Sequence, residues 1–240
     1  MKHGAAKDAV YPVLMWLHGM SCSLACEQCI SQSGGELFAS EAYQQAMGDG
    51  AYIIVPLANE KKLENGEILG YWDDSYIEPI KGIYDRVVEA NLQTISKLFV
   101  MGGSMGGTFT WKLLETFPDY FDGGIPISAD YVPEDAVLDK IIQAGVHLIV
   151  AHGRHDELLK FDDIIAPRLL KLKSMKNTIC YFPEWVRNGD YGIASIDYGI
   201  EMGQHCLINQ FQANLIFDTG KPYLEELPCG VTGWIRKQVL

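Results

Sequence analysis

Residues 98–107 read Leu-Phe-Val-Met-Gly-Gly-Ser-Met-Gly-Gly, so an apolar run leads directly into a Gly-x-Ser-x-Gly pattern centred on Ser104. The run predicts a buried strand, and a helix should follow because large apolar residues recur every four positions up to a proline: Phe109, Leu113, Phe117 and Pro118. A serine between strand and helix at this spacing is typical of a nucleophile elbow, where glycines let other backbone pass close by. The alternative is an ordinary glycine-rich turn, but the order of the elements favours an exposed nucleophile at Ser104.

A serine nucleophile needs a base for its proton, and the base needs a carboxylate that holds it in the right tautomer. The apolar run 146–151 predicts another strand, and Asp156 follows in the loop after it. Such a loop can reach across the edge of a parallel sheet, so we expect Asp156 to be the acid. The alternative carboxylates are Glu157, Asp162 and Asp163.

Of the six histidines, His205 is the best candidate for the base. It follows the last predicted strand and precedes a helix-like stretch at 207–217. His152 and His155 lie too near Asp156 in the same loop to be its expected partner, so each is interpreted as a supporting residue. The alternative for His205 is a surface histidine without a catalytic role.

A developing oxyanion needs fixed donors, usually two backbone N–H groups. One should be the N–H of Met105, directly after the nucleophile. The run 11–17 predicts a central strand that ends in His18-Gly19, and the N–H of Met20 is the second candidate. The alternative is a plain turn after the strand.

In these segments the chain resembles the α/β-hydrolase superfamily, and within it the esterases grouped with feruloyl esterases, polyhydroxybutyrate depolymerases and predicted peptidase-like carboxylesterases. The matching segments run almost end to end: 12–19 (PVLMWLHG), 98–107 (LFVMGGSMGG), 117–128 (FPDYFDGGIPIS), 147–156 (HLIVAHGRHD) and 203–205 (GQH). The resemblance implies the same roles for Ser104, Asp156 and His205, with Met20 and Met105 as oxyanion donors. We expect no cofactor.

The beginning of the chain departs from that family, which usually has two antiparallel strands before the strand that ends in His-Gly. Only ten residues precede Tyr11. The sheet should therefore be shortened at its N-terminal edge, completed by a partner chain, or truncated. Strand 11–17 would then be an unpaired edge exposing Val13, Leu14 and Met15, and we expect a possible homodimer to cover it.

Three cysteines after His-Gly are a second departure. Cys22, Cys26 and Cys29 have the C-x3-C-x2-C spacing with which radical S-adenosylmethionine enzymes hold an iron-sulfur cluster, and zinc is also conceivable. However, Gln28 stands where an aromatic residue is usual in those enzymes, and the hydrolase segments occur in order. We interpret the three as reduced thiols that hold no metal.

Composition is consistent with a single α/β-hydrolase domain over residues 1–240, since the chain is long enough and 48% hydrophobic. Apolar runs without alternation predict strands of a mostly parallel sheet, with helices on both faces: 51–57, 97–101, 124–127, 146–151 and 178–182. Longer helical stretches are expected at 77–95 and 162–175.

A net charge of −12 argues against nucleic acid and anionic membranes as partners. The start of the chain lacks the apolar stretch of a secretion signal, and no run approaches the length of a membrane span. We therefore expect a cytoplasmic protein with free thiols.

The substrate is expected to be a small-molecule ester. Two insertions should wall the pocket, 59–76 with Tyr71 and Trp72, and 184–204 with Trp185, Tyr191 and Tyr198. Trp72 and Trp185 are the candidate substrate-binding residues, although such aromatics could equally pack the loops onto the body. With no large lid in view, the sequence predicts a serine carboxylesterase for small or aromatic esters. The alternatives are a peptidase or thioesterase, a non-catalytic binding module, and a metal protein.

Overall fold

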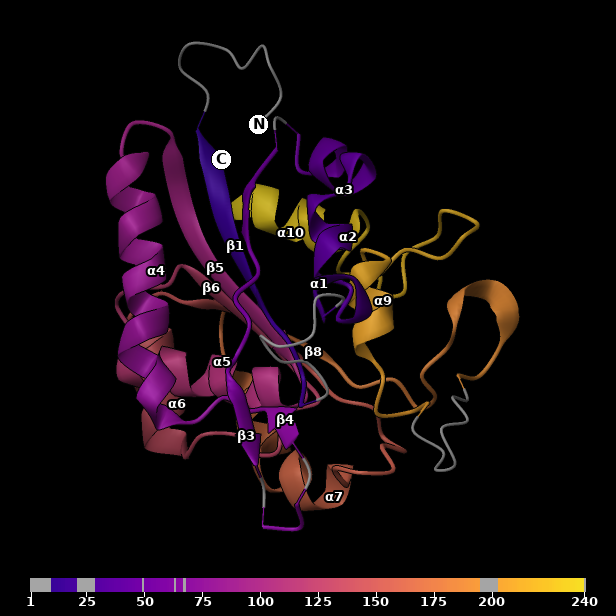
Figure 1. Cartoon of the computed structure of the whole chain (residues 1–240). Coiled ribbons are helices and arrows are strands. Elements are labelled where there is room, and N and C mark those ends of the chain that lie inside the picture. The colour runs from indigo at the N-terminus through magenta and orange to yellow at the C-terminus, as the bar shows by residue number, and fades with distance from the viewer. Residues whose placement is uncertain are drawn as a thin grey trace.

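A six-stranded sheet runs through the middle of the molecule in the order β2-β1-β5-β6-β7-β8, and all its pairings are parallel (Figure 1). The computed structural model describes residues 10–20, 29–48, 50–62, 64–66, 68–194 and 203–239. The strands are β1 (Tyr11–Leu17), β2 (Tyr52–Ile54), β5 (Ile95–Gly103), β6 (Gly123–Ile127), β7 (His147–Ala151) and β8 (Thr178–Tyr181). A separate antiparallel hairpin joins β3 (Glu60–Lys62) to β4 (Ile68–Gly70).

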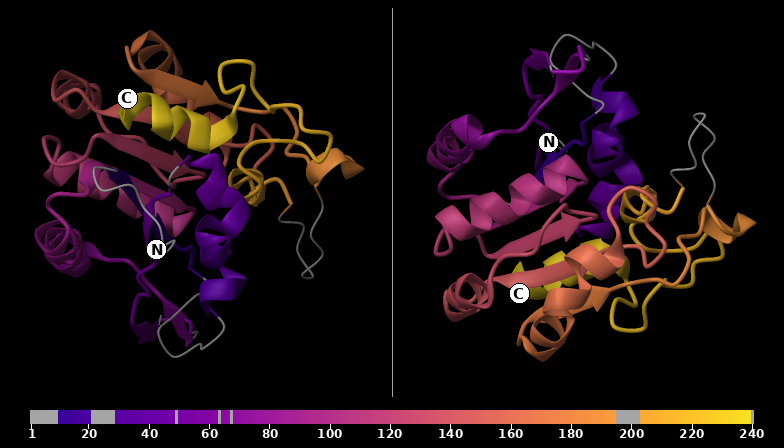
Figure 2. Two further views of the ribbon diagram at one scale, coloured as in Figure 1. Left: turned by 90° about the horizontal axis from the view of Figure 1, so that it is seen from above. Right: turned by 90° about the horizontal axis from the view of Figure 1, so that it is seen from below.

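Helices cover both faces of the sheet (Figures 1 and 2). On one face lie α4 (Ile77–Ala90), α5 (Met105–Thr116), α6 (Asp135–Gln143), α7 (Phe161–Ile164) and α8 (Leu169–Ser174). On the other lie α2 (Gly35–Ala39), α3 (Glu41–Ala46), α9 (Ile208–Gln212) and α10 (Gly230–Val239), with α1 (Cys29–Gln32) before α2. None of the helices in these described ranges has the length and apolar character needed to cross a membrane.

Each central strand has apolar side chains on both faces, as the sequence runs predict. In β1, Val13 and Met15 pack into the core under α4 and α5, whereas Leu14 and Trp16 pack into the core under α2, α3 and α10. A strand buried on both faces gains from apolar residues at every position, so the run shows no alternation. The expected α/β-hydrolase architecture is confirmed at this level.

The expectation that strand 11–17 forms an unpaired edge is wrong. β1 is interior, because β2 pairs with it on one side through Val13↔Tyr52 and Met15↔Ile54, and β5 pairs on the other. Val13, Leu14 and Met15 are completely buried. The edge is instead the short strand β2, so the expected self-association loses the exposed edge on which it was argued.

Other boundaries differ for local reasons. The expected helix 162–175 is divided into α7, a 3-10 turn at Ala166–Arg168 and α8, since Pro167 cannot donate the hydrogen bond that a continuous helix needs. The helix-like stretch 207–217 ends at Gln212, and Asn214 and Leu215 follow with positive φ angles of 58° and 55°.

Candidate active site

Ser104 lies in a sharp turn between β5 and α5, with φ 57° and ψ −123°. This backbone conformation is uncommon for any residue with a side chain and costs about 1–3 kcal/mol. The surrounding glycines are required by space: a Cβ on Gly102 would lie 2.3 Å from the carbonyl oxygen of Gly106, and one on Gly106 would lie 2.0 Å from that of Leu17. The elbow therefore depends on Gly102 and Gly106, which let the end of β5, the start of α5 and the end of β1 approach closely.

The structure brings Ser104, His205 and Asp156 into one hydrogen-bonded chain. His205 Nε2 lies 2.9 Å from Ser104 Oγ, and His205 Nδ1 lies 2.8 Å from Asp156 Oδ2. Because a carboxylate only accepts, Nδ1 carries the proton and Nε2 is left to accept from the serine hydroxyl. The arrangement can therefore move a proton from Ser104 to His205, which is the first requirement for nucleophilic attack.

Asp156 is almost fully buried beneath His205. Burial alone raises the pKa of its carboxyl, but the hydrogen bond and charge of His205 and the N–H of Leu159 outweigh burial and bring this pKa below its ordinary value. Its second oxygen, Oδ1, accepts the backbone N–H groups of Leu158 and Leu159 at 3.0 and 2.8 Å. The carboxylate is thus ionised and held in one orientation.

The other candidates lie elsewhere. His152 Nε2 donates to the carbonyl of Leu159 over 2.7 Å and lies 3.6 Å from Asp156 Oδ2. Burial lowers the pKa of His152. His155 contacts Glu184. Asp162 and Asp163 are exposed in the first turn of α7. Glu157 contacts backbone N–H groups at His205 instead of its ring.

Of the two expected oxyanion donors, Met105 directly follows Ser104 and Met20 follows Gly19 in the loop after β1. Met105 is the first residue of α5, so its N–H has no acceptor one turn back in the helix. Gly19 is close by, since a Cβ built on it would lie 3.6 Å from Ser104 Cβ. His18 Nδ1 donates to the carbonyl of Gly19 over 2.6 Å. Because the peptide bond is planar and trans, this aims the N–H of Met20 away from His18.

Trp72 packs against the loop after β1, which carries His18 and Gly19, and is only 3% exposed. Its Nε1 donates to the carbonyl of His18 over 3.0 Å, and its ring packs against those of His18 and Phe109. Its backbone N–H points to the sulfur of Met105 at 3.3 Å. Trp72 therefore packs its insertion onto the body of the protein, in contact with both parts of the expected oxyanion site.

Trp185 has the opposite environment and is 46% exposed. Its ring stacks face to face on that of His155, with centroids 3.9 Å apart and planes 23° apart. His155 directly precedes Asp156, so Trp185 packs against the loop of the candidate acid. Tyr198, expected in the same insertion as Trp185, lies outside the described residues.

Cys22 and Cys26 of the C-x3-C-x2-C pattern also lie outside the described residues, and Cys29 begins α1, fully buried. Within the described ranges, no group of three or more His, Cys, Asp or Glu side chains is placed to hold a metal ion. Burial raises the pKa of Cys180 to about 11, and that of Cys206 is also raised, so both are poor thiolate ligands.

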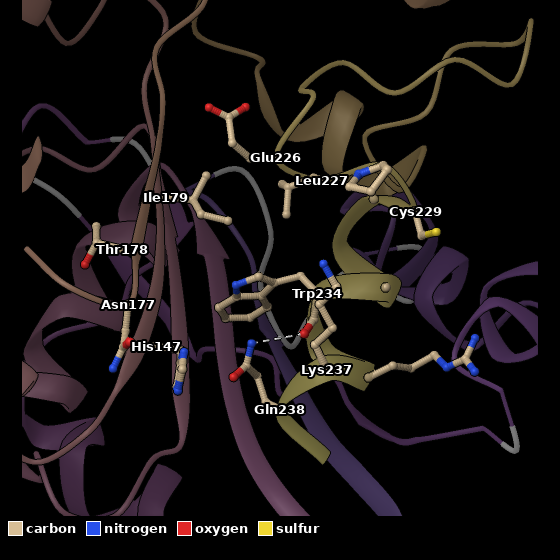
Figure 3. Close-up of a pocket in the computed structure, with 14 residues that line it drawn as sticks. His147, Asn177, Thr178, Ile179, Glu226, Leu227, Cys229, Trp234, Lys237 and Gln238 are labelled. Atoms are coloured by element: carbon tan, nitrogen blue, oxygen red, sulfur yellow. Dashed lines mark hydrogen bonds between the residues drawn. The ribbon is translucent and has the colours of Figure 1, made fainter. Parts of the chain in front are cut away.

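Two cavities lie away from the triad. The larger, of about 450 Å³, lies at the amino ends of the strands, because its lining residues His147 and Asn177 stand at the starts of β7 and β8 (Figure 3). Figure 3 shows Trp234 of α10 between them and Lys237. The triad residues lie at the carboxyl ends. The smaller, of about 210 Å³, is lined by Arg187, Asn209, Tyr223 and neighbouring residues. Neither is lined by Ser104, Asp156 or His205.

No protein-family model matches the sequence, and no curated protein matches it. Solved structures do match. A thermostable esterase aligns with a TM-score of 0.57 at 16% identity over 77% of this chain, which spans 50% of that protein. SOBER1 of Arabidopsis thaliana aligns with a TM-score of 0.53 at 19% identity, over 85% of this chain and 98% of its own. The protein FAE aligns with a TM-score of 0.55 at 14% identity, over 88% and 78%.

Identities this low carry the fold and nothing finer. The parallel strand order and the helices on both faces agree with this likeness in fold. The chain therefore has the α/β-hydrolase fold.

Proposed function

We propose that the protein is a serine carboxylesterase that forms an acyl-enzyme on Ser104. The observation that carries this proposal is the continuous chain from Ser104 Oγ through His205 to Asp156, with contacts of 2.9 and 2.8 Å. Both distances are within the range required for proton transfer. The strained backbone at Ser104 supports the proposal, because strain of this kind concentrates at functional sites.

In the proposed first half-reaction, Ser104 Oγ attacks the ester carbonyl while His205 Nε2 takes its proton. The carbonyl oxygen becomes an oxyanion, which the N–H groups of Met20 and Met105 stabilise. Asp156 stabilises the resulting imidazolium through Nδ1. The tetrahedral intermediate then collapses, the bond to the alcohol breaks, and His205 gives its proton to the leaving alcohol oxygen.

In the second half-reaction, water replaces the alcohol. His205 Nε2 takes a proton from the water as it attacks the acyl carbon, and the same two N–H groups stabilise the second oxyanion. Collapse breaks the bond to Ser104 Oγ, which recovers the proton from His205 as the carboxylic acid leaves. The ionised, buried Asp156 serves both halves equally.

For the substrate class, we propose small or aromatic esters. Trp185 supports this, because its exposed ring, stacked on His155, offers a flat apolar surface beside the loop that carries Asp156. Planar groups stack favourably on such a surface. Trp72 takes part by holding the Gly19 loop, since it is packed too deeply to offer its face to a substrate.

The proposal is tested with a panel of p-nitrophenyl esters of increasing acyl length, an aromatic ester, a thioester and a peptide anilide. Wild type should hydrolyse the esters best, and Ser104→Ala should lose activity by on the order of 10⁴-fold or more while keeping its unfolding temperature. Retention of a tenth of the activity by Ser104→Ala would remove the serine from the mechanism. Preference for the thioester or anilide would replace the carboxylesterase assignment.

A further inference from the structure

The carboxylate of Glu157 binds the backbone of the residue that supplies the proposed base. Its Oε2 accepts the N–H of His205 over 3.0 Å, and its Oε1 accepts the N–H of Gln204 over 3.1 Å. Two consecutive N–H groups therefore converge on one side chain. Because two neighbouring N–H groups donate to one side chain, the contact restrains the peptide unit from which the His205 ring projects.

Asp156 binds the ring of His205, and Glu157 binds its backbone. Asp156 Oδ2 accepts from Nδ1 of the His205 ring at 2.8 Å, which sets the rotation of the imidazole. Glu157 holds the His205 backbone, which sets the position from which the ring extends toward Ser104. Because these two acids are adjacent in the loop after β7, one short segment determines both the direction and the distance of Nε2 relative to Ser104 Oγ.

A second anchor holds the same segment from the other side. The buried amide of Gln204 accepts the N–H of Val186 at 2.7 Å and donates to the carbonyls of Val186 and Ala194 at 3.2 and 3.0 Å. Packing here leaves no spare room, since a Cβ on Gly153 would lie 2.7 Å from the carbonyl oxygen of Gln204. Gln204 thus fixes residues 204–205 to the segment around Trp185, while Glu157 fixes them to the loop after β7.

We infer that Glu157 is a positioning residue that keeps His205 Nε2 at hydrogen-bonding distance from Ser104 through the backbone. This inference rests on the proposed function for its effect on rate, but the hydrogen bonds to the two N–H groups are independent of it. Misplacing a catalytic group by about 1 Å can cost on the order of 10²-fold in rate. Glu157 touches no reacting atom, so its loss should act on kcat more than on KM.

The test compares Glu157→Ala and Glu157→Gln with a matched control, Glu78→Gln, which removes an exposed carboxylate on α4. We expect kcat for a p-nitrophenyl ester to fall on the order of 10- to 100-fold in Glu157→Ala, with KM changed less than about threefold. Glu157→Gln keeps the shape and one acceptor oxygen, so its kcat should lie between. The control should match wild type.

Backbone amide exchange and ¹H–¹⁵N spectra supply a readout that needs no substrate. The amides of Gln204 and His205 should shift and exchange faster in Glu157→Ala than in wild type, and stay unchanged in the control. A kcat within twofold of wild type, or unaltered amides, would overturn the inference, and so would a loss of rate matched by a loss of folded protein in both Glu157 variants. Wild type without esterase activity would overturn the proposed function instead, and the amide spectra would still decide whether Glu157 holds His205.

Discussion

The ring of His18 accepts the backbone N–H of Ala58 at Nε2, over 3.0 Å, in the interior of the protein. This contact settles the tautomer, because an Nε2 that accepts leaves Nδ1 as the donor toward Gly19. Burial lowers the pKa of His18, and the hydrogen bond to Gly19 offsets only part of the shift. The neutral ring therefore acts as a fixed bridge between the loop after β1 and the loop after β2.

The first prediction concerns this bridge. His18→Leu removes both hydrogen bonds and should lower kcat on the order of 10²-fold, because the N–H of Met20 loses its aim at the oxyanion. His18→Asn keeps a donor close to the position of Nδ1 and should retain more of the rate. Steady-state kinetics on one ester decide the matter, and equal rates for Leu, Asn and wild type would contradict the assigned role.

The second prediction concerns strain at the elbow. Ser104→Gly and Ser104→Ala both remove the nucleophile, but only glycine adopts φ 57° and ψ −123° without steric cost. Relief of the backbone strain favours Ser104→Gly, and the greater freedom of glycine in the unfolded chain offsets part of this gain. We therefore expect Ser104→Gly to be more stable than Ser104→Ala by about 1 kcal/mol. Urea unfolding measures the difference, and the opposite order would show that the turn is relaxed.

The third prediction separates two glycines by their surroundings. Gly106→Ala places a methyl group 2.0 Å from the carbonyl oxygen of Leu17 and should destabilise the fold by at least about 3 kcal/mol. Gly82→Ala lies within helix α4, where the new Cβ would stay 4.0 Å from Arg86 Nη1, and should stabilise the fold by about 0.5–1 kcal/mol. Denaturant midpoints test both, and similar effects would mean that the elbow can shift to make room.

The fourth prediction follows from the ionised Asp156. Its folded-state pKa lies below the ordinary value of 3.8, so the group contributes stability above that pH and loses the contribution as pH falls through the folded-state value. The stability advantage of wild type over Asp156→Asn should therefore shrink as the solution is acidified below about pH 4. An advantage that grows over this acid range would reverse the assigned direction.

The fifth prediction concerns the exposed aromatic pair. Trp185→Ala should raise KM for an aromatic ester several-fold more than for an acetyl ester, because only the planar group can stack on the ring. Leu170→Ala on α8 is the control, since Leu170 is also exposed but lies in the helical layer that contains α4 and α6. Equal changes for both esters would place the bound acyl group away from Trp185.

Local chemistry explains which features the sequence predicts well. The elbow is readable because its requirements, an apolar strand, two glycines and an apolar helix, all lie within about twenty residues of Ser104. Asp156 and His205 are candidates because each follows a predicted strand. The structure brings both to Ser104, although their catalytic roles stay predictions until tested.

Features that depend on distant pairing are harder to predict. A strand is expected at 51–57, but the sequence does not show that it pairs with β1 more than thirty residues earlier, so β1 is wrongly expected at an edge. The contact of Glu157 with His205 depends on how two loops meet, and the only signal in the sequence is a second acid directly after Asp156. Likewise, His18 looks like an ordinary strand end until its contact with Ala58 is known.

The interior position of β1 has a consequence for how the chain folds during synthesis. Tyr11 pairs with Ile95, so the strand leaves the ribosome about 80 residues before its longest partner. At roughly 5–20 residues per second, the edge of β1 that pairs with β5 waits about 4 to 16 seconds for its partner, although β2 is made earlier. Such an apolar strand is prone to pair with other chains during this time. A nascent chain therefore carries this apolar strand without its β5 partner until residue 103 has been made.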